Sequence, residues 1–210
     1  IDEDKDLYLF FVTLNGLVKK TPIEEFKNIR QSGKIAITLK EDDQLVSVKL
    51  TSKDDQILVA ASNGKLIRFS ETDVRPMGRS ASGVRGINVD GSRVVGMTTD
   101  SEGEFIMAIS ENGYGKMSPL EDYRESHRGG KGVKTINTTE KTGQLVALRA
   151  VRGDEDLLII TSEGIVIRLP MEQVKTAGRN TQGVRLIKVS EGSTVSSVEV
   201  VEKAEEEIEE

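Results

Sequence analysis

The sequence predicts an all-β fold of four propeller-like blades, and three observations support this. Glycines recur in hairpin-type turn signals at intervals of 48, 49 and 51 residues. A second glycine follows each of them after 17 to 19 residues. Short apolar runs of strand length flank these glycines, with no long amphipathic helical pattern between them. Fixed repeats of this size are typical of propellers, in which one repeat forms one four-stranded sheet. The turn glycines are Gly16, Gly64, Gly113 and Gly164, followed by Gly33, Gly83, Gly132 and Gly183.

Each repeat of about 48–51 residues presents its elements in the same order. The first strand is an apolar run, at Tyr8–Thr13, Ile57–Ala61, Phe105–Ile109 and Leu157–Thr161. An Asn-Gly or Glu-Gly turn leads into a second strand, and after a polar loop the third strand begins at the second glycine. The fourth strand is expected at Leu45–Leu50, Val94–Thr98, Leu145–Ala150 and Thr194–Val200. Single turns of helix are expected at Ile23–Phe26 and Leu120–Tyr123. A blade cannot bury both faces of its sheet alone, so neighbouring blades must stack.

These repeats divide the chain into an acidic segment 1–6, a body 7–201 and an acidic tail 202–210. The blades are expected at about 7–55, 56–103, 104–154 and 155–201. The net charge of −6 comes from the ends, because 199–210 carry −6 and 1–6 carry −3. The body therefore has a small positive charge. The tail lacks aromatic residues and repels itself, which predicts a disordered or loosely helical segment.

The composition excludes several classes of protein. The chain has no cysteine, which excludes disulfides and thiolate metal sites. Hydrophobic residues make up 36% and aromatic residues only 4%, so the core must consist mainly of Val, Ile and Leu. No stretch is long and apolar enough to cross a bilayer, and no signal peptide is visible. We therefore expect a cytoplasmic protein, and the initial Ile1 suggests a fragment of a longer chain.

Basic residues recur at fixed offsets from the glycines, which favours binding to a regularly spaced polyanion. Cations stand three or four residues after the first glycine, three or four before the second, and two after the second. Duplex DNA is such a polyanion, and lysine and arginine bind its phosphates without reading sequence. Aromatic residues are too few to favour stacking on single strands. The predicted DNA-binding residues are Lys19, Lys20, Arg30, Lys34, Arg68, Arg79, Arg85, Lys116, Arg128, Lys131, Lys134, Arg168, Arg179 and Arg185.

An alternative hypothesis is a propeller-like scaffold that binds protein partners. In that case the cations are ordinary surface residues inherited by duplication, and exposed ion pairs contribute little to stability. The first repeat has Ile35 where the others have a cation two residues after the second glycine. That position is therefore not held by an obligatory ion pair.

The repeated motifs resemble the C-terminal domain of the A subunit of bacterial DNA gyrase. They are N-G-x-x-K-K-T, G-R-S-A-S-G-V-R-G-I, K-G-V-K-T-I and G-R-N-T-Q-G-V-R-L-I. The resemblance covers about residues 7–200, and the run Gly178–Ile187 is its most specific part. The paralogous subunit of topoisomerase IV has a related domain and remains an alternative.

The resemblance implies a β-pinwheel of six blades that exchange a strand, of which this chain would hold the last four. It implies a module that wraps duplex DNA on a basic rim and supports ATP-dependent negative supercoiling by an A2B2 holoenzyme in the bacterial cytoplasm. Strand cleavage would lie elsewhere, in the N-terminal region of the gyrase A polypeptide, with ATP hydrolysis in the B subunit. No catalytic centre and no cofactor are therefore expected in this chain. The family's basic box, Q-R-R-G-G-R-G, is missing, and its nearest match is S-H-R-G-G-K-G at Ser126–Gly132.

The other candidate residues do not form a catalytic or metal-binding site. His127 is the only histidine, so a metal site or catalytic base would lack partners. The pairs Asp42–Asp43 and Asp54–Asp55 fall in predicted turns, where Asp is locally favoured. A calcium loop after Asp100 is excluded because Phe105 stands where such a loop requires glycine. The acidic tail suggests either a segment that competes with DNA for the cations or a segment that keeps the protein soluble.

Overall fold

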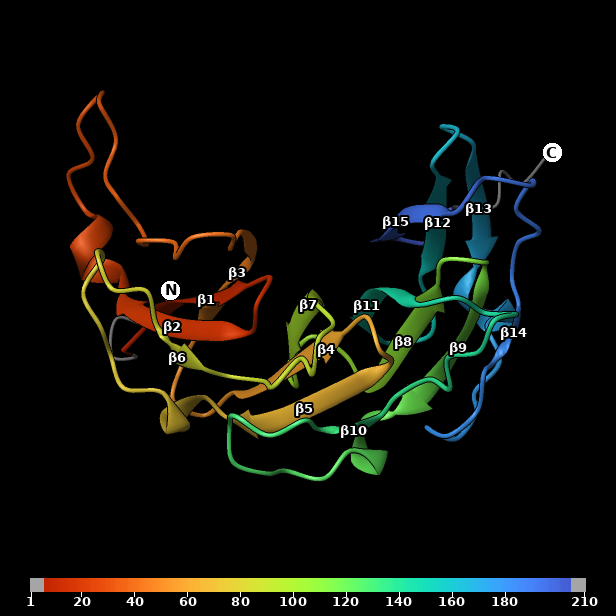
Figure 1. Cartoon of the computed structure of the whole chain (residues 1–210), viewed down its shortest axis with the longest axis horizontal. Coiled ribbons are helices and arrows are strands. Elements are labelled where there is room, and N and C mark those ends of the chain that lie inside the picture. Colours follow the sequence, from red (N-terminus) through yellow and green to blue (C-terminus); the bar gives the residue numbers. More distant parts are fainter. Residues whose placement is uncertain (1–5, 205–210) are drawn as a thin grey trace, which may run out of the picture. The chain divides into compact units, whose positions relative to one another are not determined.

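The computed structural model describes residues 6–204 and consists of strands, loops and short 3-10 turns (Figure 1). Residues 6–101 together with Tyr123–Val133 form one compact unit. Residues 102–122 together with 134–204 belong to a second unit. The predicted acidic segment 1–6, except Asp6, and the last six residues of the predicted tail 202–210 lie outside the described residues. No helix in the described part of the chain is long and apolar enough to span a bilayer.

The first unit contains two antiparallel sheets. Their strand orders are β3-β1-β2-β6 and β10-β5-β4-β7 (Figure 1). The strands are β1 (Tyr8–Thr13), β2 (Leu17–Pro22), β3 (Leu45–Thr51), β4 (Gln56–Ala61), β5 (Lys65–Ser70), β6 (Val84–Arg85), β7 (Val94–Thr99) and β10 (Val133–Lys134). Two 3-10 turns, η1 (Ile23–Phe26) and η2 (Glu71–Asp73), follow β2 and β5.

The second unit repeats this plan with the strand orders β11-β8-β9-β14 and β13-β12-β15. The strands are β8 (Phe105–Ser110), β9 (Tyr114–Pro119), β11 (Leu145–Val151), β12 (Asp156–Thr161), β13 (Val166–Pro170), β14 (Val184–Arg185) and β15 (Val195–Val201). The turns η3 (Leu120–Asp122) and η4 (Met171–Gln173) follow β9 and β13. The predicted all-β fold, the first and fourth strands of every repeat and the two predicted helical turns are therefore confirmed, with bounds shifted by at most a residue.

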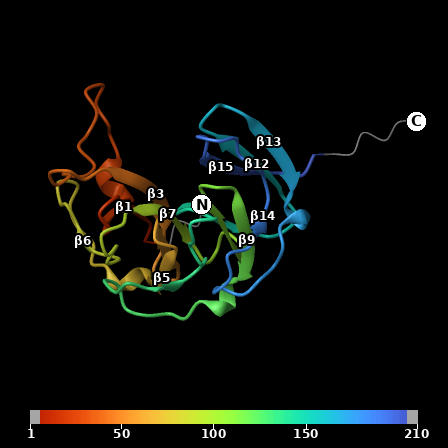
Figure 2. The same ribbon diagram turned by 45° about the vertical axis from the view of Figure 1, so that its right-hand side comes forward.

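The third strand of the second, third and fourth repeats begins one residue after the second glycine, in agreement with the prediction. It has only two residues in the later repeats, and it pairs with the second strand of the preceding repeat. Thus Val84 pairs with Val18 of β2, and Val184 pairs with Gly115 of β9. Figures 1 and 2 show β14 beside β9 in both views. The strand exchange that the resemblance implied is thus present, and the blades are mixed from two repeats.

Only in the first repeat is the prediction wrong, because no strand begins at Gly33. Within residues 6–204 the segment after Gly33 forms no strand. Its counterparts pair with a second strand one repeat earlier, and no repeat precedes the first one in the described residues. For the corresponding reason the sheet of β13 has three strands, because no later repeat in the described residues supplies a fourth.

Each unit has its own apolar core. In the first unit Phe10, Val59 and Phe69 are fully buried, and in the second Leu157 and Ile159 are. Valine, isoleucine and leucine form most of both cores, as predicted, with phenylalanine and methionine filling the remaining space. Most core residues lie on the strands, and buried loop residues such as Ile87 and Ile187 complete the two cores.

Two glycines make the strand exchange sterically possible. Gly83 has a φ of +102°, and a Cβ there would lie 2.5 Å from the carbonyl oxygen of Val18. Gly183 has a φ of +75° and approaches the carbonyl of Gly115 in the same way. Each glycine therefore provides both a left-handed backbone and the close approach of one repeat to the next.

Replacing these glycines tests the exchange. We expect Gly83→Ala and Gly183→Ala to lower the free energy of unfolding by roughly 3–5 kcal/mol, from backbone strain plus a clash with a carbonyl. Gly33 is the matched control, because its φ is +75° but no atom lies within 4 Å of its added Cβ. Gly33→Ala should lose only about 1–2 kcal/mol. Urea unfolding measures these differences, and equal losses at all three positions would contradict the exchange.

Candidate nucleic-acid interface

The structure separates the predicted DNA-binding residues by burial. Lys19, Lys20 and Lys116 are 0%, 4% and 1% exposed. The half-buried cations are Lys34, Arg68, Arg79, Arg128 and Arg179. The exposed cations are Arg30, Arg85, Lys131, Lys134, Arg168 and Arg185. Because a phosphate must reach the charged atoms, the three buried lysines are corrected from phosphate contacts to structural residues.

One hydrogen bond between consecutive repeats occurs three times. The arginine four residues before the second glycine donates from its Nη1 to a carbonyl of the preceding repeat. That carbonyl belongs to the residue two positions after the second glycine. The bonds are Arg79 to Ile35 (2.9 Å), Arg128 to Arg85 (3.0 Å) and Arg179 to Lys134 (3.0 Å). The position four residues before the second glycine of one repeat therefore lies beside the position two residues after the second glycine of the preceding repeat.

In two of the three bonds, the residue whose backbone accepts the bond is itself a cation. Arg128 contacts the backbone of Arg85, and Arg179 contacts the backbone of Lys134. A carbonyl oxygen carries no formal charge, so the bond orients the guanidinium without neutralising it. Neighbouring cations repel one another unless an anion lies between them. The pairs therefore form a surface that suits a polyanion.

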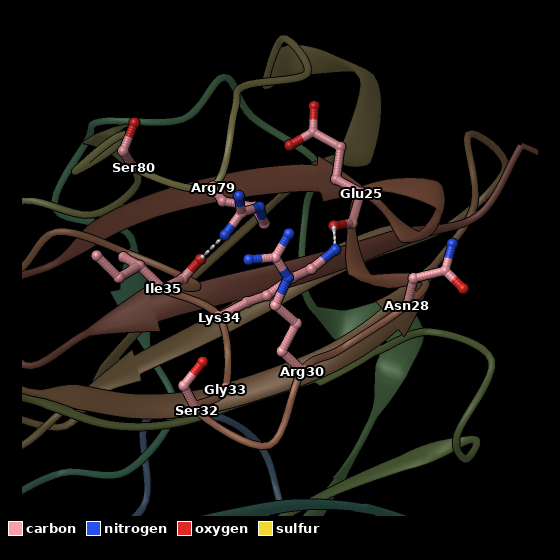
Figure 3. A pocket seen from close by; sticks show the side chains of 9 residues that line it. All are labelled: Glu25, Asn28, Arg30, Ser32, Gly33, Lys34, Ile35, Arg79 and Ser80. Atoms are coloured by element: carbon pink, nitrogen blue, oxygen red, sulfur yellow. Dashed lines mark hydrogen bonds between the residues drawn. The ribbon is translucent and has the colours of Figure 1, made fainter.

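A cavity of about 730 Å³ in the first unit shows the same convergence of cations (Figure 3). Arg30, Lys34 and Arg79 extend toward one another from its walls. The Lys34 Nζ donates to the carbonyls of Glu25 (3.3 Å) and Lys27 (2.5 Å). Two guanidinium groups and an ammonium match the donors that bind phosphate, and backbone oxygens hold those of Arg79 and Lys34.

A smaller cavity of about 210 Å³ is formed by the segment that resembles the basic box. Arg68, Arg124 and Lys131 line it. Lys131 is half-exposed and contacts Asp90 at 3.0 Å, an ion pair that contributes little at the surface. The His127 side chain is almost fully exposed, and its Nδ1 lies 3.4 Å from Asp73 Oδ2.

Sequence reasoning missed one periodic set of cations. Arg75, Arg124 and Lys175 each stand eight residues before the second glycine, and all three are exposed. The first repeat has Glu25 at that offset. The same glycine-based alignment that identified the other cations would have identified these.

Lys20 forms a buried ion pair. Its Nζ lies 2.9 Å from Glu71 Oε1, and both side chains are at most 5% exposed. In the second unit, methionines occupy the equivalent positions, Met117 and Met171, within the apolar core. The equivalence is set by backbone pairing, because Lys20 bridges to Pro76 as Met117 bridges to Thr176. One unit therefore uses an ion pair where the other uses apolar packing.

Two arginines of the second unit are held by neighbouring side chains. Arg168 Nε donates to Asp156 at 2.7 Å, and this bond lowers the pKa of the Asp156 carboxyl. Arg185 lies over the ring of Tyr114, and its Nη2 contacts the Tyr114 hydroxyl at 3.1 Å. Both arginines keep surface exposure. Among residues 6–204, no group of His, Asp and Glu is placed to hold a metal ion.

Repeated sheets with exchanged strands and cation-bearing loops define a β-pinwheel, a relative of the β-propeller. The chain belongs to the DNA gyrase C-terminal domain family, whose β-propeller model matches residues 7–52, 55–99, 104–152 and 155–202. The resemblance stated from the motifs is thereby confirmed.

Known proteins agree with this assignment. The DNA gyrase A protein of Staphylococcus epidermidis (strain ATCC 12228) is 44% identical over 207 residues, which cover 97% of this chain and 23% of that protein. The gyrase A protein of Staphylococcus aureus (strain MRSA252) is 44% identical over 209 residues, 98% of this chain and 24% of that protein. The chain thus spans about a quarter of the length of these relatives.

Solved structures show the same fold. A DNA gyrase A C-terminal domain superposes with a TM-score of 0.84 at 26% identity, covering 95% of this chain and 67% of that one. A topoisomerase IV C-terminal domain superposes with a TM-score of 0.88 at 26% identity, covering 96% and 64%. The chain is homologous to the gyrase A domain, and the topoisomerase IV alternative is not favoured, because the relatives at 44% identity are gyrase A proteins.

The ion pair of the first unit can be exchanged for the packing of the second. Removing one partner, by Lys20→Met or Glu71→Met, should lower the free energy of unfolding by about 3–5 kcal/mol, because a buried charge is left unpaired. The double variant should unfold within about 1 kcal/mol of the wild type or be more stable. Thermal unfolding of the four proteins measures this cycle. Additive losses in the double variant would show that the pair is not equivalent to Met117 and Met171.

Lys116 should give the stability a distinctive pH dependence. Burial and, to a lesser extent, nearby Arg179 lower the pKa of Lys116 to about 8, and Asp122 partly opposes this. The unfolded chain therefore binds more protons than the folded chain between about pH 8 and the ordinary lysine pKa of 10.5. The free energy of unfolding should therefore rise as the pH increases across that window, and it should fall as the pH decreases toward 8. Urea unfolding of the wild type and Lys116→Met should diverge in that window, and parallel curves would contradict the shifted pKa.

Proposed function

We propose that this chain is a DNA-binding module that holds and bends duplex DNA through phosphate contacts from its loop cations. The observation that carries the proposal is the thrice-repeated bond from an arginine to the preceding repeat. In two of the three cases this bond joins an arginine to the backbone of another cation, Arg85 or Lys134, and it leaves the charge of the arginine available. Duplex phosphates are regularly spaced anions, and binding them releases counterions.

The proposed contact residues are the cations that a phosphate can reach. They are Arg30, Lys34, Arg68, Arg79, Arg85, Arg128, Lys131, Lys134, Arg168, Arg179 and Arg185, together with Arg75, Arg124 and Lys175. They lie in loops and on strands, and contacts from these cations to phosphates would not depend on sequence.

The family relationship supplies the wider context of the proposal. As part of a gyrase A protein, the module would act with the N-terminal region of the same polypeptide and with the gyrase B partner on the bacterial chromosome in the cytoplasm. There it would bend the DNA segment that the ATP-driven holoenzyme passes through another, supporting negative supercoiling. Bending a stiff duplex costs energy, which several phosphate contacts offset.

Binding across a salt series tests the proposal. The logarithm of the association constant should fall linearly with the logarithm of salt concentration, and Arg85→Ala or Arg179→Ala should reduce the slope by about 0.9. Lys53→Ala is the control, since Lys53 is exposed in the turn after β3, outside the proposed set. Ligation of nicked circles with the protein bound should change the linking number. Binding that does not depend on salt would favour the protein-scaffold alternative.

A further inference from the structure

The first and third repeats share a lysine that the proposed DNA contacts do not use. Lys19 on β2 and Lys116 on β9 each stand three residues after the first glycine of their repeat. They are 0% and 1% exposed. The second and fourth repeats have Ile67 and Ile167 at this offset. Burying an ammonium is unfavourable unless its donors are satisfied, so the lysines need a specific reason to be there.

Both lysines hold the loop of the following repeat. Lys19 Nζ donates to the carbonyl oxygens of Gly78 (3.1 Å), Arg79 (2.8 Å) and Ala36 (2.6 Å). Lys116 Nζ donates to the carbonyls of Gly178 and Arg179 (2.8 Å) and contacts Thr181 Oγ1 at 3.2 Å. Three acceptors match the three donors of an ammonium group. The same arrangement occurs once in each unit.

The lysine and the Gly-Arg pair occur together along the chain. Lys19 is followed by Gly78-Arg79 in the next repeat, and Lys116 by Gly178-Arg179. Where the lysine is replaced by Ile67, the next repeat has His127 before its arginine instead of glycine. The lysine therefore occurs where the next repeat has the Gly-Arg loop that the lysine contacts. An isoleucine fills the site where that loop differs.

The arginine of this loop is held at both ends. Its carbonyl accepts the lysine bond, and its guanidinium bonds to the preceding repeat, Arg79 at Ile35 and Arg179 at Lys134. The charges that face Lys116 are Arg179 and Asp122, and those that face Lys19 are Arg79 and Glu25. Each lysine thus lies near the like charge of the arginine that it orients. A phosphate beside the arginine would relieve that repulsion.

We propose that Lys19 and Lys116 are positioning residues that fix Arg79 and Arg179 for contact with a phosphate and never touch DNA themselves. This inference rests on the proposed DNA-binding function. It differs from a purely stabilising role because the bonds end on the backbone of the arginine itself. An apolar residue such as Ile67 satisfies the same position where stability alone is required.

A double-mutant cycle on duplex binding tests the inference. Lys116→Met removes the donors and keeps an unbranched side chain of similar length. It should weaken binding of a mixed-sequence duplex about tenfold, because one charge-assisted contact is misplaced. Arg179→Ala should weaken it similarly, and Lys116→Met should have no further effect in the Arg179→Ala background. Lys19→Met with Arg79→Ala gives an independent second cycle, and Lys53→Met is the control for loss of one positive charge.

Hydrogen exchange of the DNA-free protein supplies a readout that does not depend on binding. The amide of Asn137 donates to the Thr181 carbonyl, and the Thr181 amide donates to Gly178. Both should exchange faster in Lys116→Met while the amides of β12 remain protected. Additive losses of affinity in the cycle, wild-type affinity of Lys116→Met, or unchanged exchange would each overturn the inference. If the wild type binds no duplex, the proposed function fails, and any faster exchange shows only that the lysine holds the loop.

Discussion

The cation-bearing loops of the second, third and fourth repeats each depend on the repeat that precedes them. A two-residue strand such as β14 contributes few hydrogen bonds, and it holds its place because Gly183 lets it lie directly against β9. From that contact the loop before it is fixed by further bonds to the same neighbour. The arginine tip is bonded at Lys134, and its backbone is bonded at Lys116. Stability and the candidate interface therefore share one set of contacts between repeats.

The lysines illustrate how one residue type serves different purposes within a repeated fold. Lys20 balances a buried carboxylate, and its counterpart in the second unit is Met117 in an apolar core. Lys116, the neighbour of Met117, binds only neutral oxygens and bears the full cost of burial. An ion pair can be replaced by packing because its two charges compensate each other. A lone ammonium that satisfies three loop oxygens has no apolar equivalent unless the loop changes too.

The carbonyl partners of the arginines orient their guanidinium groups without neutralising their charge. Carboxylate partners would orient arginines but would cancel the field that attracts an anion. Carbonyl partners, such as that of Arg85 for Arg128, orient the guanidinium and leave its charge intact. In the described part of the chain, two of the proposed contact cations do pair with carboxylates: Lys131 with half-exposed Asp90, in a pair that salt screens readily, and Arg168 with buried Asp156. This distribution suits a surface that must exchange its counterions for phosphates.

Much of the fold followed from local sequence signals. Turn glycines such as Gly113, the apolar first strands and the offsets of Arg79 and Arg179 repeat because each repeat folds by the same short-range rules of turn and strand formation. The resemblance of the motifs to the gyrase A domain was sufficient to assign the family. The first strands of the hairpins and the two predicted 3-10 turns were correct to about one residue, as at β1 and η1, whereas η2 and η4 were not predicted.

Only the tertiary structure decided which repeat each short strand joins and which cations remain reachable. Val84 carries no local signal that it pairs with Val18 and not with its own hairpin, because strand pairing is a long-range choice. Lys19, Lys20 and Arg68 look alike in sequence, as cations on a second strand. Burial depends on the neighbouring sheet and loop, which approach from tens of residues away. The sequence by itself thus determined the repeat, the strands and the periodic charge, whereas packing between repeats determined which of those charges face solvent.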